Sequence, residues 1–87
     1  MPKLEKEVKI MNKQGLHARP AAQFVQIAVK YDSKITVKKD DEAVNGKSIM
    51  GILMLGAQHQ NSIRIIVEGE DAEQAMNELE GFLNKNE

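Results

Sequence analysis

The sequence predicts an α+β fold, an open-faced β-sandwich in which a four-stranded antiparallel sheet carries three helices on one face. Two periodicities support this prediction. Residues 5–11 and 34–38 alternate apolar and polar residues, as half-buried strands do, and two longer segments repeat apolar residues every three or four positions, as amphipathic helices do. The predicted elements follow one another in the order βαββαβα. Because the strands are short and dispersed, a doubly wound parallel sheet is excluded, and helices on one face leave the other face to water.

The first strand and the first helix are joined by a short turn. Residues 5–11 alternate and predict a strand, and residues 12–15 have the composition of a turn that ends at Gly15, where a positive φ costs little. Pro20 suits only the first turn of a helix, so the helix is expected to begin just after His17. Its apolar stripe comprises Ala21, Phe24, Val25, Ala28 and Tyr31.

The rest of the chain predicts five further elements. They are a β-hairpin of strands 34–38 and 43–44, a short helix at 48–55, a strand at 62–68 rich in β-branched residues, and a last helix whose apolar stripe runs from Ala72 to Leu83. Ser48 is a candidate N-cap of the short helix. Asp71, with Gln74 three residues later, is a candidate cap of the last helix.

Length and composition restrict the class of protein. Residues 1–87 are expected to form one compact domain, too small for a deep catalytic cleft. The chain has no cysteine, which excludes disulfides and thiolate chemistry, and no apolar run typical of a signal peptide or a membrane span, so a cytoplasmic location is expected. A net charge of −1 and only three aromatic residues argue against nucleic acid as a partner. Neither a metal nor a cofactor is expected, since His59 lacks neighbours at metal-ligating spacing.

Residues 15–20, Gly-Leu-His-Ala-Arg-Pro, place an imidazole at the start of the first helix and a guanidinium two residues later. A helix N-terminus offers unpaired backbone N–H groups and a partial positive charge, so a phosphoryl group on His17 would meet the N–H groups of Ala18 and Arg19. The same charge favours the neutral imidazole, which can attack phosphorus without a base. The Arg19 guanidinium suits the oxygens of a transferring phosphoryl group. An isolated histidine before a helix is usually a polar cap, but the whole pattern favours phosphoryl transfer.

A second candidate site begins at Ser48. Serine is a favoured N-cap, so a purely structural role stays open for this residue. The neighbouring Ile49, Met50 and Leu53 cannot all face the core, so at least some are expected to form an exposed docking surface beside His17, with core packing as the alternative for each. The acidic residues of the hairpin turn and the last helix are interpreted as solvated faces; they are Asp40, Asp41, Glu42, Glu73, Glu78 and Glu80.

Two motifs of this sequence resemble one known family. Residues 15–22 resemble the phosphorylation-site motif of the histidine-containing phosphocarrier protein of the bacterial phosphotransferase system, HPr. Residues 47–52, followed by Leu55-Gly56, resemble that family's regulatory serine segment. The resemblance implies that His17 accepts a phosphoryl group on Nδ1 from phospho-enzyme I and passes it to sugar-specific enzyme IIA domains, with Arg19 assisting. It implies a monomeric relay with a covalent phosphohistidine intermediate rather than an independent enzyme.

The resemblance also assigns roles to the second motif. In Gram-positive-like members, an ATP-dependent kinase/phosphorylase phosphorylates the serine that matches Ser48 as a signal of carbon status, which adds that enzyme and a transcriptional regulator to the implied partners. A phosphate there would fit the helix N-terminus yet repel a phosphorylated donor. In the family, partners contact the surface that corresponds here to the start of the short helix and the outer face of the first helix, which gives the docking residues Ala22, Gln23, Ile49, Met50 and Leu53.

Two other interpretations stay open on the sequence. The nitrogen-related branch of the family keeps the motif of residues 15–20 but feeds regulation, and Met54 and the turn 58–61 depart from the commonest patterns of the carbohydrate branch. The second alternative is a binding module that regulates a partner through the apolar residues after Ser48, with His17 only a cap. Some regulatory relatives lack the histidine, and its presence here argues against a purely signalling role.

Overall fold

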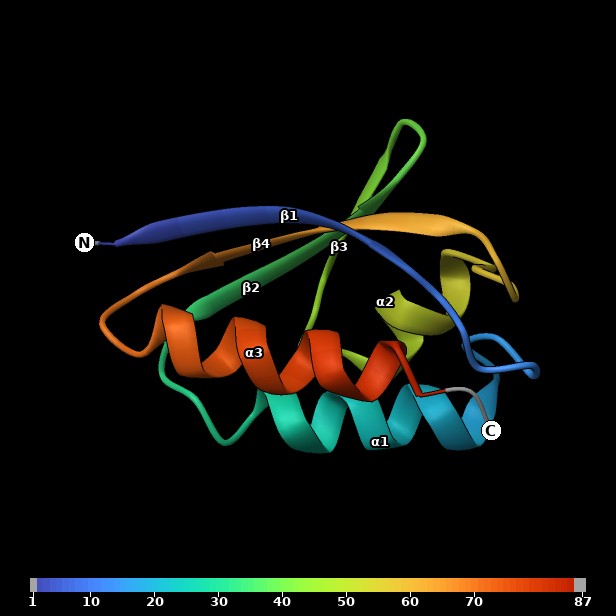
Figure 1. Ribbon diagram of the computed structural model, residues 1–87, viewed down its shortest axis with the longest axis horizontal. Coiled ribbons are helices and arrows are strands. Elements are labelled where there is room, and N and C mark those ends of the chain that lie inside the picture. Colours follow the sequence, from blue (N-terminus) through green and yellow to red (C-terminus); the bar gives the residue numbers. More distant parts are fainter. Residues whose placement is uncertain (1, 86–87) are drawn as a thin grey trace.

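A computed structural model describes residues 2–85 and contains a four-stranded sheet and three helices (Figure 1). The strands are β1 (Lys3–Lys9), β2 (Lys34–Lys39), β3 (Glu42–Asn45) and β4 (Ser62–Glu68), and the helices are α1 (Ala18–Ala28), α2 (Ile49–Met54) and α3 (Ala72–Leu83). The sheet order is β1-β4-β2-β3, and all neighbouring strands are antiparallel. The helices α1 and α3 run side by side under one face, and α2 packs beside α1. The predicted open-faced sandwich is confirmed.

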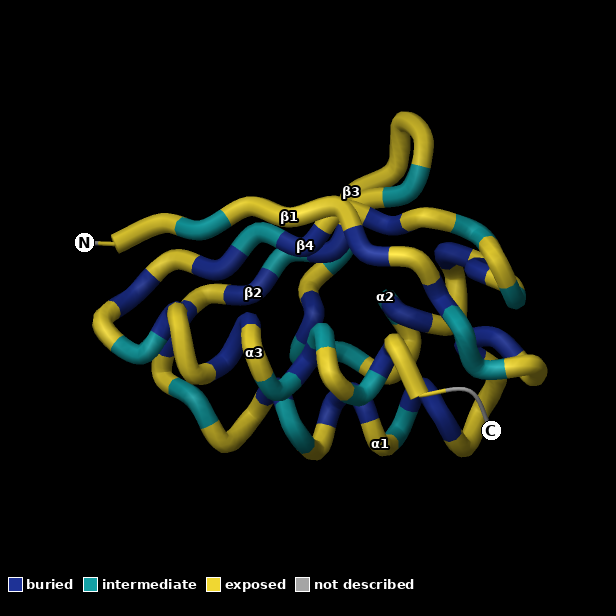
Figure 2. The backbone as a smooth tube through the Cα atoms, in the orientation of Figure 1, coloured by how far each residue is buried: buried dark blue, intermediate teal, exposed yellow. Residues whose placement is uncertain are grey.

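The core lies between the sheet and the helices, where the buried segments of Figure 2 face one another. In the central strand β4, Ile63, Ile65 and Val67 are buried and alternate with more exposed residues, so one face of the sheet supplies them all. Phe24 of α1 and Leu79 of α3 meet them from the helical layer with no exposed surface. Burial of each such side chain contributes roughly 1.5–3 kcal/mol relative to exposure. The apolar periodicities of the sequence therefore correspond to one continuous core.

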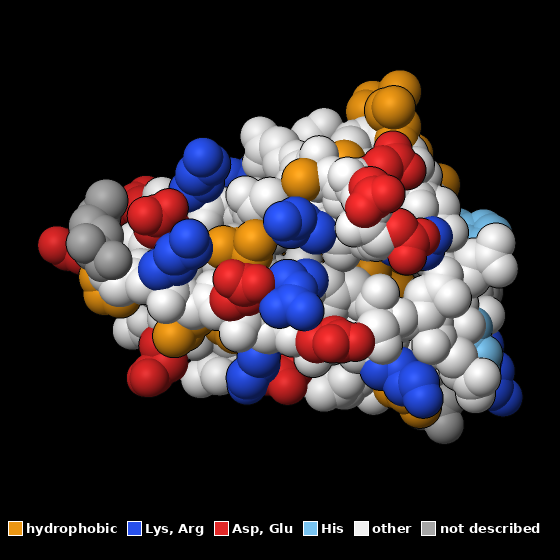
Figure 3. Space-filling model, turned by 90° about the horizontal axis from the view of Figure 1, so that it is seen from above, with side chains coloured by type: hydrophobic (Ala, Val, Ile, Leu, Met, Phe, Trp, Pro, Cys, Tyr) orange, Lys and Arg blue, Asp and Glu red, His pale blue; other side chains and the backbone are white. Residues whose placement is uncertain are grey.

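The other face of the sheet is open and charged. Basic and acidic side chains interleave across it (Figure 3), and Arg64 of β4 pairs with Glu5 of β1 at 2.9 Å. A hollow of about 560 Å³ on this face is lined by charged residues that include Glu7, Lys38 and Arg64. Within residues 2–85, no helix is long and apolar enough to cross a bilayer.

Two predicted boundaries are wrong at β1 and α1. Strand β1 covers Lys3–Lys9 rather than residues 5–11, because its first residues already pair with the end of β4. Helix α1 ends at Ala28, so Tyr31 lies beyond the helix instead of on its apolar stripe. The Tyr31 side chain is half-buried and its hydroxyl donates a hydrogen bond to Glu78 of α3.

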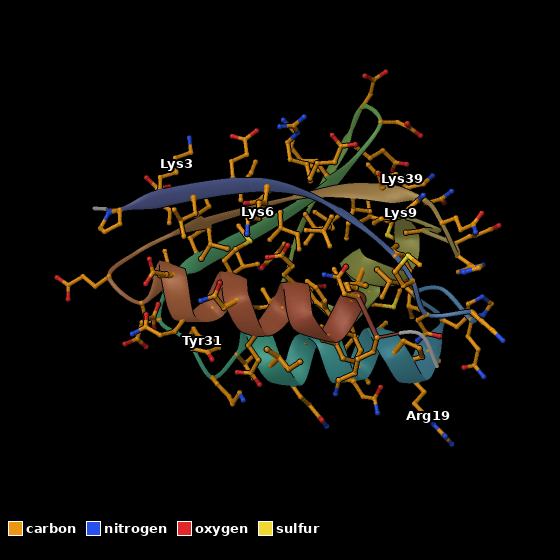
Figure 4. The ribbon with its side chains drawn as sticks, in the orientation of Figure 1. Lys3, Lys6, Lys9, Arg19, Tyr31 and Lys39 are labelled. Atoms are coloured by element: carbon orange, nitrogen blue, oxygen red, sulfur yellow. The ribbon has the colours of Figure 1, made fainter. Side chains whose placement is uncertain are left out.

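Glu78 and Glu80 of α3 bind side chains of neighbouring elements. The interpretation of these two residues as part of a simply solvated face is therefore wrong. Glu78 accepts hydrogen bonds from Lys30 Nζ at 2.6 Å and from the Tyr31 hydroxyl. The hydrogen bond from Lys30 is the main reason that the pKa of Glu78 lies below its ordinary value, and the hydrogen bond to Glu78 raises the pKa of Tyr31. Glu80 pairs with Lys6 at 2.7 Å, and Figure 4 shows Lys6 reaching from β1 toward α3.

Asp71 occupies the N-cap position of α3, as predicted, but its side chain does not cap the helix. Its backbone has φ −96° and ψ 23°, and its side chain makes no capping hydrogen bond. The carboxylate instead accepts hydrogen bonds from the Ser33 hydroxyl and from the N–H groups of Asp32 (2.8 Å) and Ser33 (3.1 Å). These bonds, the one from the hydroxyl above all, hold the pKa of Asp71 below its ordinary value. Asp71 therefore ties the start of α3 to the loop between α1 and β2.

Asp71→Asn is expected to destabilise the protein at neutral pH and to have a smaller effect in acid. Because the folded-state pKa lies below the unfolded one, the stabilisation by the carboxylate is present above the ordinary aspartate pKa and is lost as the pH falls through the lowered folded value. Urea unfolding at about pH 7 and about pH 2 measures this difference. The control is Asp41→Asn, which changes an exposed carboxylate in the β2–β3 turn. A destabilisation by Asp71→Asn that is equal at both pH values would contradict the linkage.

Candidate functional site

His17 lies at the end of the loop that joins β1 to α1. Asn12 organises this loop: its side-chain oxygen accepts a hydrogen bond from the Gln14 N–H at 2.9 Å, and its carbonyl accepts one from the Gly15 N–H at 3.0 Å. Gly15 then adopts a φ of +68°, a conformation that favours glycine. The next side chain, Leu16, is buried, and His17 is exposed. The turn predicted from the sequence thus directs Leu16 into the core and the imidazole outward.

A second loop, residues 57–61 between α2 and β4, supports the first; we call it the support loop. The N–H of Leu16 donates a hydrogen bond to the Ala57 carbonyl at 3.0 Å. A Cβ placed on Gly15 would lie only 2.8 Å from Gln58 Cα and 2.9 Å from the Ala57 carbonyl oxygen. A glycine is therefore needed at position 15 both for its φ and for this close approach. The sequence identified Gly15 as a turn residue. It did not predict the contact of Gly15 with the support loop, because no local pattern indicates a contact between distant segments.

His17 is the N-cap residue of α1, as the predicted start of the helix requires. Its backbone is extended (φ −80°, ψ −171°), and its carbonyl accepts the first helical hydrogen bond, from the Ala21 N–H at 2.7 Å. Its side chain makes no capping hydrogen bond and is exposed. The structure therefore does not support the alternative in which the imidazole serves only to cap the helix.

The donors next to His17 are the backbone N–H groups of Ala18 and Arg19. Neither has a hydrogen-bond acceptor within residues 2–85, as expected in the first turn of a helix. The Arg19 side chain is exposed, takes part in no ion pair of the described residues, and points from the N-terminal end of α1 into solvent (Figure 4). The structure thus places backbone donors beside His17 and leaves the Arg19 guanidinium exposed at the same end of α1.

Ser48 is the N-cap of α2, and the predicted structural role is confirmed. Its backbone is extended, and its Oγ accepts a hydrogen bond from the Gly51 N–H at 3.0 Å. The preceding residue, Lys47, donates from Nζ to the Tyr31 carbonyl at 2.6 Å and so joins this segment to the loop after α1. Phosphorylation of Ser48 stays a prediction.

Exposed apolar side chains gather on α2. Ile49, Met50, Leu53 and Met54 are 44%, 67%, 36% and 68% exposed, and we call these four residues the α2 patch. Ile52 is fully buried, so one side of the helix faces the core and the other faces solvent. Of the two docking residues predicted on α1, Ala22 is half-buried and Gln23 is exposed. The prediction that at least some of residues 49, 50 and 53 are exposed is confirmed, since all three are, but it missed Met54 and also Val29, which is 57% exposed just after α1.

These features define a protein whose candidate site lies on its surface rather than in a cavity. An exposed histidine meets two backbone donors at a helix start, and an apolar patch lies on the adjacent helix. The hollow on the open face of the sheet does not include His17. Within residues 2–85, no group of three or more side chains is arranged to hold a metal ion.

The chain belongs to the HPr family of the phosphotransferase system. Residues 4–85 match the family model described as the PTS HPr component phosphorylation site. The chain is 45% identical over 82 residues to the HPr-like protein Crh of Halalkalibacterium halodurans, covering 94% of this chain and 98% of that one. It is 42% identical over 81 residues to the phosphocarrier protein HPr of Neisseria meningitidis, covering 93% and 91% of the two chains.

Solved structures agree with this assignment. The crystal structure of the phosphocarrier protein HPr from Bacillus anthracis superposes with a TM-score of 0.93 at 42% identity and covers 97% of this chain and 100% of that one. The crystal structure of Crh from Bacillus subtilis, described as a dimer with a swapped domain, gives a TM-score of 0.77 at 36% identity over 95% of each chain. Members of this fold thus include a dimer as well.

Proposed function

We propose that this chain is a single-domain, cytoplasmic phosphocarrier that accepts a phosphoryl group on His17 from phospho-enzyme I and delivers it to enzyme IIA domains of the phosphoenolpyruvate-dependent sugar phosphotransferase system. The observation that carries the proposal is the exposed imidazole at the start of α1, with the N–H groups of Ala18 and Arg19 lacking acceptors beside it. Membership of the HPr family supports it.

The geometry suits a group that is gained and lost with little rearrangement. In each transfer, the lone pair of a neutral ring nitrogen forms a bond to phosphorus while the donor's bond to phosphorus breaks. The phosphoryl oxygens then lie near the N-terminal end of α1, where the helix dipole and the two backbone donors stabilise negative charge. Arg19 supplies a further positive charge when it turns toward the phosphoryl group. Passage to an acceptor is the same displacement in reverse.

Incubation with purified enzyme I and phosphoenolpyruvate tests the proposal. The intact mass is expected to increase by one phosphoryl group, and the adduct is expected to be labile in acid and stable in alkali, as a phosphohistidine is. Addition of an enzyme IIA domain is then expected to remove the adduct. The proposal would be overturned if the mass of this chain stayed unmodified while the same enzyme I preparation phosphorylated another HPr protein. We also propose that the chain is a monomer, as the family resemblance implies. Light scattering during size-exclusion chromatography tests this against the dimer described for Bacillus subtilis Crh.

A regulatory role is the second candidate function, because a Crh protein is among the similar relatives. In that case the α2 patch binds a partner protein and phosphoryl transfer through His17 is secondary. The nitrogen-related branch is a related alternative, in which phosphorylation of His17 feeds regulation. Transfer from His17 to a sugar-specific enzyme IIA domain favours the carbohydrate branch, whereas transfer only to a regulatory IIA domain favours the nitrogen branch.

We also propose that phosphorylation of Ser48, by a serine kinase/phosphorylase, regulates His17 and recruits a transcriptional regulator. Ser48→Asp is expected to slow phosphorylation of His17 by about tenfold or more, because it adds negative charge next to the docking surface of a phosphorylated donor. Initial rates with limiting enzyme I measure this. Ser48→Asn is the matched neutral control, since asparagine is an equally good N-cap. Equal rates for the two variants would contradict the switch.

A further inference from the structure

Two methionines are the most exposed members of the α2 patch. Met50 and Met54 are 67% and 68% exposed and lie four residues apart in α2, so they project from the same side of the helix. The chain has no cysteine, which leaves methionine thioethers as its oxidisable sulfur atoms. Met76 of α3 is only 2% exposed, and Met11 is half-buried. Because oxidation of methionine follows exposure, these two thioethers are the most accessible of the four methionines that the structure describes.

We propose that Met50 and Met54 form an oxidation site at which peroxides convert both thioethers to sulfoxides and weaken docking of enzyme I. The docking half of this proposal rests on the proposed function. In each step a sulfur lone pair attacks one peroxide oxygen, a sulfur–oxygen bond forms and the oxygen–oxygen bond breaks. Sulfur is oxidised by two electrons, and hydrogen peroxide is reduced to water, or an organic hydroperoxide to its alcohol. Methionine sulfoxide reductases reverse the change, so the site is reversible.

The two methionines lie on the exposed side of α2, away from the core. A sulfoxide replaces an adaptable apolar group by a polar one beside Ile49 and Leu53, which opposes the burial of the patch against a partner. The contacts that hold α2 in place lie elsewhere: Ile52 is fully buried, and the Ser48 Oγ accepts its capping hydrogen bond from the backbone N–H of Gly51. Oxidation is therefore expected to change docking while the fold is retained.

A peroxide time course with peptide mass spectrometry tests the site itself. Met50 and Met54 are expected to be oxidised about tenfold faster than Met76 or more, and reductase treatment is expected to restore both. Met76 serves as the internal control, since it belongs to the same chain and is in the core. Equal rates at the three positions, or slower oxidation of the α2 methionines, would overturn the proposal.

Phosphorylation by enzyme I tests the effect on docking, with peroxide removed by catalase before enzyme I is added. Oxidised wild-type protein is expected to be phosphorylated about tenfold more slowly at limiting concentration, with its circular dichroism and urea midpoint unchanged. The control is the double variant Met50→Leu/Met54→Leu, whose phosphorylation rate is measured before and after peroxide treatment. Peroxide is expected to leave the rate of this variant unchanged. An unchanged wild-type rate after complete oxidation of both residues overturns the coupling. A chain that is not phosphorylated even before oxidation instead overturns the proposed function, and the coupling with it.

Discussion

His17→Ala is expected to abolish phosphorylation by enzyme I and phosphoenolpyruvate, with a loss of more than about 10³-fold in initial rate. The imidazole is the covalent acceptor in the proposed function, and the backbone donors at the start of α1 cannot replace it. The only other histidine, His59, is half-buried in the support loop and does not begin a helix. Intact mass after incubation with enzyme I measures the effect.

The same variant is expected to fold normally, which makes the result interpretable. The His17 side chain is exposed and makes no capping hydrogen bond, so its removal should change the free energy of unfolding by about 0.5 kcal/mol or less. The matched control is His59→Ala, which removes the second imidazole and is expected to be phosphorylated like the wild type. An acid-labile adduct on His17→Ala would show that the acceptor is another residue.

Gly15→Ala is expected to be the most damaging addition of a single methyl group in the site. Its φ of +68° costs an alanine about 1 kcal/mol, and the new Cβ would meet backbone atoms of Ala57 and Gln58 at 2.9 and 2.8 Å. Because these atoms belong to the support loop, one of the two loops must move. A total loss of roughly 2–4 kcal/mol in the free energy of unfolding is expected, together with slower phosphorylation of the displaced His17.

Gly56→Ala separates the two contributions to that loss. Gly56 also has a positive φ, +61°, but a Cβ there would meet no atom within 4 Å. This variant is expected to lose only the conformational term of about 1 kcal/mol and to be phosphorylated at the wild-type rate. Urea unfolding and initial rates on both variants are the measurements. Equal losses of stability for the two variants would show that the close approach of the loops does not constrain Gly15.

Most of the fold could be predicted because its elements are marked by local periodicity. The strand 62–68 was predicted with the bounds that the structure shows, since it is rich in β-branched residues and Gly69 follows. Asp71 could not be predicted in the same way. Its sequence context is that of a helix cap, but its carboxylate binds the Ser33 segment instead, and the choice between local and distant donors depends on tertiary packing.

The candidate site could be located because a helix start is a local feature. Pro20 and the glycine before His17 were sufficient to place the imidazole at the first turn of α1. The extent of the α2 patch could not be predicted from a six-residue helix, since the side that faces the core is determined by α1 and β3, against which α2 packs. For the same reason Met54 was not recognised as exposed.

The strand order also governs when the chain can fold during synthesis. β1 is the first strand to leave the ribosome, but its partner β4 is the last, and β4 also separates β1 from β2 in the sheet. Until Ser62–Glu68 has emerged, the N-terminal strand and the β2–β3 hairpin do not belong to one sheet. Such non-local pairing slows folding and leaves the apolar side chains of a waiting strand exposed. Nascent chains that stall before β4 are therefore expected to be the ones that need chaperones.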